Sequence, residues 1–158
     1  MAHRIVPSLP RIKVPIGHIP QRLKARPFEA PQGRLEVLRQ FVTRLVREER
    51  IEMKANRAEE TRPYIERLIQ LGVFRGMNDD YTQEMMQWWL LEKDLVDKME
   101  HVIVPRFQEA PINEPYTNLF NLPFTRYENR VRGKRIHYNA RPLAVIEIKG
   151  NPYPEIGA

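Results

Sequence analysis

The spacing of the apolar residues changes near position 50, and this change restricts the possible folds more than any other feature of the sequence. Before it, apolar residues recur every three or four positions, the period of one helix face: Leu35, Leu38, Phe41, Val42, Leu45 and Val46. Continuing that period would need apolar residues where Glu49 and Glu52 stand. Ile51 and Met53 instead alternate with polar neighbours, which is typical of a short, half-buried strand. The stretch therefore predicts that a helix ends and a strand follows at once.

A second helix is predicted directly after this strand. Asn56 offers an N-cap oxygen, and Glu59 stands three residues later, as in a variant of the capping box. Gly72 is a plausible C-cap at the other end. Pro63 lies inside the helix and predicts a kink or a restart after Arg62, because proline cannot donate the backbone hydrogen bond.

Two more helices are predicted between residues 79 and 105. Asp79 and Asp80 favour a helix N-terminus. They precede a heavy apolar stripe that we expect to be core: Tyr81, Met85, Trp88, Trp89 and Leu91. A joint at residues 92–94 leads to a short helix that is expected to stop at Pro105. The apolar residues of that helix are Leu95, Met99, Val102 and Ile103.

Two strands are predicted near the C-terminal end, at residues 116–124 and 143–148. Alternating aromatic residues indicate the first strand, and a nearly continuous apolar run indicates the second. Pro123 should place its strand at an edge or a bulge. The order of helix, strand, three helices and two strands predicts a two-layer α+β domain over residues 34–151. Residues 125–142 are expected to form a long basic hairpin loop, and residues 152–158 a C-terminal tail.

Residues 1–33 are predicted to form an extended basic arm. The acid-free start is similar in composition to an organellar transit segment, but five prolines prevent the amphipathic helix that such a segment normally forms: Pro7, Pro10, Pro15, Pro20 and Pro27. No secretory h-region follows Met1, and no apolar run approaches the roughly 18 residues of a membrane span. We therefore expect no integral membrane span.

The net charge of +6 is distributed very unevenly. Residues 1–28 contain six basic residues and no acid, whereas residues 51–100 contain seven basic and eleven acidic residues, a net charge of −4. Residues 125–142 contain six basic residues and one acid, a net charge of +5. Two basic regions that flank an acidic middle favour a polyanionic partner, since lysine and arginine release condensed counterions when they neutralise phosphates. An uneven but solvated surface is the alternative.

The sequence offers no catalytic constellation, so we predict no enzyme, cofactor or metal site. Cysteine is absent, and the four histidines lack metal-ligand spacing. No glycine-rich phosphate loop occurs, and the only serine, Ser8, lies in the arm. The carboxylate pairs at 48–49 and 59–60 are expected to be solvated at helix ends.

Binding chemistry is concentrated in residues 125–142. There, five arginines and one lysine are interleaved with Tyr127, His137 and Tyr138, a pattern typical of proteins that combine phosphate contacts with base stacking. The guanidinium fork can bind phosphate with two hydrogen bonds and can stack on a base. A basic loop could also meet an acidic protein or an anionic membrane. Folded RNA is favoured because two basic regions could hold separate backbone segments, and no recognition helix for DNA is apparent.

Several short motifs, in order along the chain, resemble bacterial-type large-subunit ribosomal protein seventeen. The first group is Arg34 with Leu38-Arg39-Gln40, Arg50-Ile51-Glu52, Arg57-Ala58, Arg62, and Glu66 followed by Leu68-Ile69. The second group is Pro105-Arg106-Phe107, Tyr116-Thr117 and Ala144-Val145-Ile146-Glu147. The resemblance covers residues 34–151. The segments 89–95 and 147–151 are similar to the mitochondrial branch of this family.

The resemblance implies a structural constituent of the large mitochondrial ribosomal subunit, in the mitochondrial matrix, on ribosomal RNA near the nascent-chain exit side. Neighbouring ribosomal proteins would be further partners. Two alternatives are a transient RNA-binding or RNA-processing factor and a basic adaptor that docks on proteins or membranes. The residues expected to contact RNA are Arg4, Arg11, Lys13, Arg22, Lys24, Arg26, Arg39, Arg44, Arg47, Arg50, Arg57, Arg106, Arg126, Arg130, Arg132, Lys134, Arg135, His137, Tyr138 and Arg141.

Overall fold

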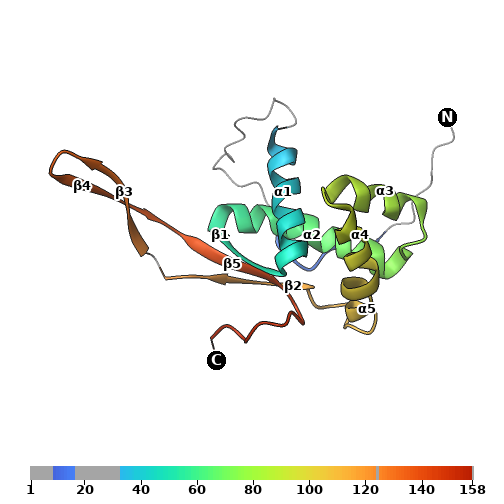
Figure 1. The fold of residues 1–158 in the computed structure, drawn as a ribbon. Helices are drawn as coiled ribbons and strands as arrows, with labels where there is room; N and C mark the ends of the chain where they lie inside the picture. The colour runs from blue at the N-terminus through green and yellow to red at the C-terminus, as the bar shows by residue number, and fades with distance from the viewer. Residues whose placement is uncertain (1–8, 17–32, 124, 158) are drawn as a thin grey trace.

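The computed structural model describes residues 9–16, 33–123 and 125–157, and for residues 125–130 and 139–141 it describes the backbone alone (Figure 1). The described residues form helices, a three-stranded sheet and a separate two-stranded hairpin. This mixture confirms the expected α+β class.

The helix-to-strand change near position 50 is confirmed. Helix α1 spans Gly33–Glu48 and strand β1 spans Arg50–Lys54, with only Glu49 between them. The backbone of Glu49 has a φ of 60°, the left-handed conformation that commonly ends a helix. Ile51 and Met53 are buried, whereas Glu52 between them is exposed, as the alternation required. Thr43 of α1 is also buried, and its hydroxyl donates to the carbonyl oxygen of Trp89 in α3 over 3.2 Å.

Helix α2 spans Ala55–Arg75, so both of its predicted ends were wrong. It begins one residue before Asn56, where the backbone N–H of Ala55 donates to the carbonyl oxygen of Pro142 over 3.1 Å. It runs through Pro63 without a restart. The glycine that ends it is Gly76, with a φ of 78°.

Gly72 serves packing rather than capping. A Cβ atom at this position would lie 2.4 Å from Cγ2 of Val104, which is far inside van der Waals contact. The missing side chain therefore lets α2 and the last helical turn approach each other closely.

The helices after α2 form one compact group. Helix α3 spans Asp80–Trp89, and its predicted start is confirmed: the Asp79 carboxylate accepts a hydrogen bond from the Thr82 N–H over 3.0 Å. Helix α4, Lys93–Lys98, continues through a π-helical turn, Met99–Ile103, into α5, Val104–Phe107. The predicted stop at Pro105 was therefore wrong. The wider π turn lies directly before the short α5, in which Pro105 occupies the first turn, where a proline needs no hydrogen-bond partner.

The apolar stripe on α3 lies only partly in the core. Met86 is fully buried, and Leu90, just after the helix, is also buried. Trp88 and Leu91, which we expected to be core, are 38% and 48% exposed. Trp89 and Met85 are half-buried at the edge of the core.

The main sheet has the strand order β1-β5-β2, and both pairings are antiparallel. Strand β2 spans Thr117–Asn121 and β5 spans Leu143–Ile148. Ile146 of the central strand is opposite Ile51 on one side and Leu119 on the other. Helices α1 and α2 contact this sheet and complete the core. The predicted edge position of the strand before Pro123 is confirmed.

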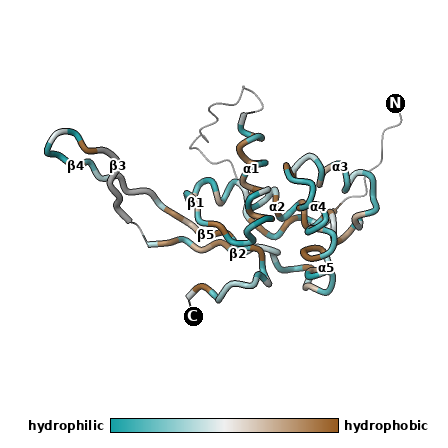
Figure 2. Tube along the Cα trace, in the orientation of Figure 1, coloured by the Kyte–Doolittle hydropathy of each residue, from teal (hydrophilic) through white to brown (hydrophobic). Residues whose placement is uncertain are grey.

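Residues 125–142 form a β-hairpin, not the loop that the sequence suggested. Strand β3 spans Thr125–Arg132 and β4 spans Arg135–Arg141, and they pair in a sheet of their own. Figure 1 shows the hairpin extending away from the body, at the opposite end of the molecule from α3. In Figure 2 the tip of the hairpin is mostly hydrophilic, with a short apolar stretch.

Candidate nucleic-acid interface

The tip of the hairpin β3–β4 presents three basic side chains within four residues. Arg132, Lys134 and Arg135 are all exposed. Arg132 and Arg135 are directly opposite each other in the strand register. Like charges in this position repel each other and destabilise the pairing. An anion that contacted both side chains would remove that repulsion.

The turn between the two strands exposes this charge to solvent. It contains two residues, Gly133 and Lys134, and Gly133 has a φ of 61°. Glycine at the first position of a two-residue turn is the arrangement of a type II′ hairpin. No heavy atom of the described residues lies within 4 Å of a Cβ built at Gly133, so this part of the chain leaves the turn uncovered.

The two faces of the hairpin differ in chemistry. Successive residues of a strand alternate between faces, so the register places Arg132, Arg135 and His137 on one face. Val131, Ile136 and Tyr138 take the other face. All six side chains are exposed. Of the remaining basic residues expected to contact RNA, Arg130 pairs with His137 in the register, and Arg126 and Arg141 lie further along the strands.

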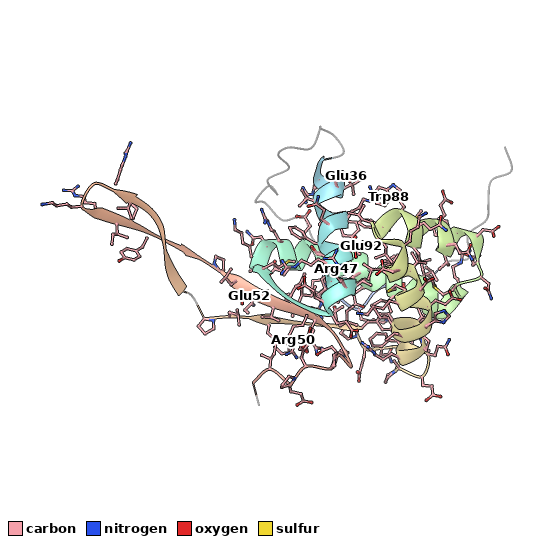
Figure 3. All side chains as sticks on the ribbon, in the orientation of Figure 1. Glu36, Arg47, Arg50, Glu52, Trp88 and Glu92 are labelled. Atoms are coloured by element: carbon pink, nitrogen blue, oxygen red, sulfur yellow. The ribbon has the colours of Figure 1, made fainter. Side chains whose placement is uncertain are left out.

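The arginines of the body, in contrast, have partners within the chain. Arg39 donates to the carbonyl oxygen of Trp88 over 2.6 Å and to the Glu36 carboxylate over 2.9 Å. Its guanidinium carbon lies 4.5 Å from the centre of the Trp88 ring, a cation–π contact. Figure 3 shows Glu36 and Trp88 near each other at the same end of α1. Arg39 therefore holds α1 against α3.

Three further arginines form contacts on the surface of α1 and α2. Arg44 pairs with Glu48 one turn later over 3.0 Å, and Arg47 binds Glu92 through two nitrogens (Figure 3). Arg57 lies over the ring of Phe41 at 5.4 Å. Exposed ion pairs such as those of Arg44 and Arg47 contribute little to stability, because solvent screens them. These cations could therefore exchange their present partners for phosphate at small cost.

Arg50 belongs to a hydrogen-bonded cluster around Glu147. Its Nε donates to the Glu147 carboxylate over 2.7 Å, and its Nη2 donates to the carbonyl oxygen of Pro154 over 2.7 Å. Asn118 and Asn151 also donate to Glu147. Burial alone would raise the pKa of Glu147, but these hydrogen bonds outweigh it and lower the pKa below its ordinary value. The cluster joins β1, β2, β5 and the C-terminal segment.

Arg106 belongs to a second cluster, around Glu49. The Glu49 carboxylate accepts from Arg106 over 2.8 Å and is 3.0 Å from the Lys98 ammonium. Burial would raise the pKa of Glu49, but hydrogen bonds from Arg106 and Lys98 lower it below its ordinary value. We expected Glu49 and Glu60 to be solvated, and that expectation was wrong, because they are only 6% and 8% exposed.

A short piece of the arm packs on the body. Ile12 and Val14 are buried, whereas the alternating residues Arg11 and Lys13 are exposed. The carbonyl oxygen of Pro10 accepts hydrogen bonds from Arg67 and Gln70 of α2. The segment therefore presents two cations outward from an anchored backbone. The other arm residues expected to contact RNA lie outside the described residues: Arg4, Arg22, Lys24 and Arg26.

Sequence reasoning missed the role of a buried carboxylate, Glu66. It is 1% exposed and accepts hydrogen bonds from the N–H groups of Tyr116 and Thr117 and from the Thr117 hydroxyl, over 3.1, 2.8 and 2.6 Å. Arg62 donates to the same hydroxyl over 3.0 Å. The sequence feature that could have indicated this role is an acidic residue beside the apolar residues Ile65 and Ile69. These motif residues thus join α2 to β2 inside the protein.

Two features are absent from the part of the chain that the structure describes. No three His, Asp or Glu side chains there gather closely enough to hold a metal ion. No described helix is both long and apolar enough to cross a membrane.

Comparison with known proteins gives a consistent result. The family model described as Ribosomal protein L17 matches residues 37–148. The "Large ribosomal subunit protein bL17" of Caldanaerobacter subterraneus subsp. tengcongensis is 34% identical over 115 residues, which is 73% of this chain and 88% of that protein. The protein of the same name from Ehrlichia chaffeensis is 26% identical over 116 residues, or 73% of this chain and 77% of that protein. In Koribacter versatilis the identity is 35% over 76 residues, which cover 48% of this chain and 45% of its relative.

Proposed function

The chain belongs to the ribosomal protein L17 family, and on that premise we propose that it is a structural constituent of the large subunit of the mitochondrial ribosome. In this role it binds and stabilises folded ribosomal RNA near the nascent-chain exit side, next to other proteins of the subunit. Its relatives carry the name of large-subunit proteins, which supports the ribosomal assignment. We assign it no catalytic role and no cofactor.

The observation that carries the RNA-binding proposal is the exposed cationic tip of the hairpin β3–β4. Arg132, Lys134 and Arg135 extend from a two-stranded ribbon that projects from the body (Figure 1). Such a ribbon can reach phosphates that a compact domain could not approach. His137 lies on the same face as the arginines, and exposed Tyr138 on the other face offers a ring for stacking on an unpaired base.

The arm is proposed as a second contact with RNA. Arg11 and Lys13 are exposed on a backbone that Ile12 and Val14 anchor to the body, so little conformational entropy would be lost on binding. The hairpin and the arm would then hold separate segments of RNA backbone.

The arginines of the body are proposed to act in two ways. Arg44, Arg47 and Arg57 make surface contacts that could be shared with phosphate. Arg39, Arg50 and Arg106 are more enclosed, with side chains that are 18%, 19% and 20% exposed. We propose that their main role is to hold neighbouring helices and strands in place. Any contact with RNA would use the N–H groups that have no partner within the protein.

The mitochondrial location is the most specific part of the proposal. Its support is the similarity of residues 89–95 and 147–151 to the mitochondrial branch, together with the acid-free, basic residues 1–28. Protease protection of the endogenous chain in purified intact mitochondria tests it. Protection that is lost only when the inner membrane is opened agrees with the proposal. Digestion in intact organelles, or absence of the chain from them, contradicts it.

The RNA-binding part is tested by the salt dependence of binding to a transcript of the large-subunit ribosomal RNA. The triple variant Arg132→Ala, Lys134→Ala, Arg135→Ala should weaken binding. It should also reduce the slope of log K against log salt by about two units, since each phosphate contact contributes roughly 0.7–0.9 to that slope. Lys93→Ala is the control: Lys93 is an exposed residue of α4, away from the hairpin, and its replacement should leave the slope unchanged. An unchanged slope in the triple variant would assign the hairpin tip to another partner.

A further inference from the structure

We propose that a pocket at the helical end of the molecule binds a lysine or arginine side chain of a protein partner. The pocket has a volume of about 550 Å³ and lies between the anchored arm segment and helices α1, α2 and α3. The proposed function supplies only the setting, an assembled ribosomal subunit. The chemistry of the pocket stands apart from it.

The walls of the pocket are aromatic and aliphatic. Tyr64 of α2 and Trp89 of α3 have ring centres 4.9 Å apart, with an angle of 43° between the ring planes. Tyr81 adds a third ring, and Met85 and Ile12 add apolar contacts. The faces of such rings attract cations, and their apolar surface accommodates the methylene groups of a long basic side chain.

The polar group of the pocket is a carboxylate with one unused oxygen. Glu60 is only 8% exposed. Its Oε1 pairs with Arg34, but its buried Oε2 has no hydrogen-bond partner among the described residues. A buried carboxylate oxygen without a donor destabilises the folded chain, because its lost hydration is not replaced. A ligand that brought an N–H donor to this oxygen would recover that free energy.

The charged side chains that line the pocket sum to zero, so the ligand class follows from the unpartnered Glu60 oxygen and the ring faces. Two arginines line it: Arg34 pairs with Glu60, whereas Arg67 donates to the neutral Pro10 carbonyl and Gln70 side chain and keeps its charge. Glu59 is exposed and also lines the pocket, so a second carboxylate adds negative charge. The unpartnered Glu60 oxygen can accept a hydrogen bond but cannot donate one to a phosphate, which disfavours RNA. A guanidinium or ammonium group satisfies both the free oxygen and the aromatic walls.

The position of the pocket agrees with a protein partner rather than RNA. Residues 51–100, which supply most of its lining, have a net charge of −4. Figure 1 places α3 at the opposite end of the molecule from the cationic hairpin. One end could therefore hold RNA while the other holds a basic segment of a neighbouring protein.

The first test uses the purified full chain and N-acetyl-arginine amide as the probe, with tryptophan fluorescence as the readout. We expect saturable binding, and binding at least tenfold weaker for the uncharged analogue N-acetyl-citrulline amide. Glu60→Gln keeps the shape of the side chain but removes the charge, and it should weaken arginine binding at least tenfold. Glu84 is an exposed residue of α3 outside the pocket, so Glu84→Gln should have no effect. Met85→Arg, which would fill the pocket with a tethered cation, should abolish binding and serves if Glu60→Gln fails to fold.

Three results of this titration would overturn the proposal. No saturable binding of the arginine probe would mean that the pocket does not hold a cationic side chain. Equal binding by the wild-type chain and Glu60→Gln would remove the carboxylate from the site. Preferential binding of adenosine monophosphate would assign the pocket to a nucleotide.

The second test identifies the occupant in the assembled particle. A photo-crosslinking phenylalanine derivative at position 85 should cross-link to a Lys- or Arg-containing peptide of another protein, and the same group at exposed Gln87 should not. Cross-links to RNA or to this same chain, or none from position 85, would contradict the proposal. If the chain does not enter a ribosomal subunit, the proposed function fails while the titration still decides the chemistry of the pocket.

Discussion

Buried carboxylates with several donors fix how the elements of this protein meet. Glu66 accepts three hydrogen bonds from the start of β2, and Glu49 and Glu147 each gather donors from several elements. Each carboxylate is less than 10% exposed, so losing one partner leaves others without hydrogen bonds. Single side chains in these clusters therefore control the stability of the whole body.

Replacing Glu66 with alanine should lower the free energy of unfolding by about 3 kcal/mol. The N–H groups of Tyr116 and Thr117 and the charge of Arg62 would lose their shared partner, and a small cavity would remain. Urea unfolding with an unchanged m-value measures the loss. Glu84→Ala, on the exposed side of α3, is the control and should shift stability by less than about 0.5 kcal/mol. Equal losses in the two variants would show that Glu66 does not join α2 to β2.

Stability should fall on acidification because of Glu49 and Glu147. Their pKa values lie below the ordinary value of 4.5 in the folded protein, since hydrogen bonds outweigh burial. A lowered pKa contributes stability that is complete above the unfolded pKa and is lost as the pH falls through the folded one. We expect urea midpoints to be nearly constant from about pH 7 to 5.5 and to fall below about pH 4.5. Glu49→Gln should be less stable at neutral pH and should show a shallower fall; an equally steep fall would exclude Glu49 as a cause.

The sequence predicted the part of the candidate site in which basic residues are adjacent in the chain. It did not predict the arginines whose hydrogen-bond partners are distant in the sequence. The basic residues near 132–135 are adjacent in the sequence, and the structure exposes them together. Arg39, Arg50 and Arg106 instead find their partners 49, 97 and 57 residues away. Periodicity cannot indicate such pairings, because they depend on the tertiary arrangement. These residues therefore resembled free cations in the sequence and proved to be enclosed in clusters.

At the level of elements, the hairpin β3–β4 is separable from the body. It forms its own sheet, and its base is closed by the hydrogen bond from Leu122 N–H to the Leu143 carbonyl over 2.9 Å. Replacing residues 123–142 with Asn-Gly should therefore give a tight turn between β2 and β5. This replacement would break the hydrogen bond from the Ala55 N–H to the Pro142 carbonyl, at a cost of about 1 kcal/mol.

The shortened protein should unfold at nearly the same urea midpoint as the full chain but bind ribosomal RNA far more weakly. Circular dichroism during urea unfolding and filter binding to the RNA transcript measure the two properties. An unfolded product would show that the hairpin supports the body. Unchanged RNA binding would show that the hairpin is not a contact site.

The arm is coupled to the body more closely than its composition suggests. Deleting residues 1–16 would expose the surface that Ile12 and Val14 cover, at a cost of roughly 1.5–3 kcal/mol for each buried side chain before the ordering entropy of the segment is subtracted. We expect a folded but less stable chain by thermal unfolding. Ile12→Ser should reproduce part of the loss, whereas Lys13→Ser should not. Equal stability of the deletion and the full chain would show that the segment does not pack in solution.

Elements with a clear period were predicted, and elements governed by distant contacts were not. Ile51 and Met53 alternate because one face of β1 is buried, so their strand was predictable. Pro105 was expected to end a helix, yet the chain adopts a π turn and continues, with Val104 packed on Gly72. The hairpin was expected to be a loop because its charged residues carry little β signal. Gly133-Lys134, between two runs that pair, was the available clue.

At the scale of the whole molecule, the two ends carry different chemistry. The projecting hairpin is cationic, and the helical end holds the pocket with the carboxylates Glu59 and Glu60 (Figure 1). A body with an apolar core and internal ion pairs separates the two. This polarity fits a protein that connects ribosomal RNA to a protein neighbour, and it makes stable incorporation into a large particle the central expectation.

The most direct measurement is sucrose-gradient sedimentation of mitochondrial lysate at high salt, with and without ribonuclease, following this chain by mass spectrometry. An integral subunit protein is held by many contacts that reinforce one another, whereas a transient RNA-binding protein loses affinity steeply as salt rises. We predict that the chain sediments with the large subunit in high salt and leaves that position after ribonuclease treatment. Sedimentation at the top of both gradients would contradict the proposed function.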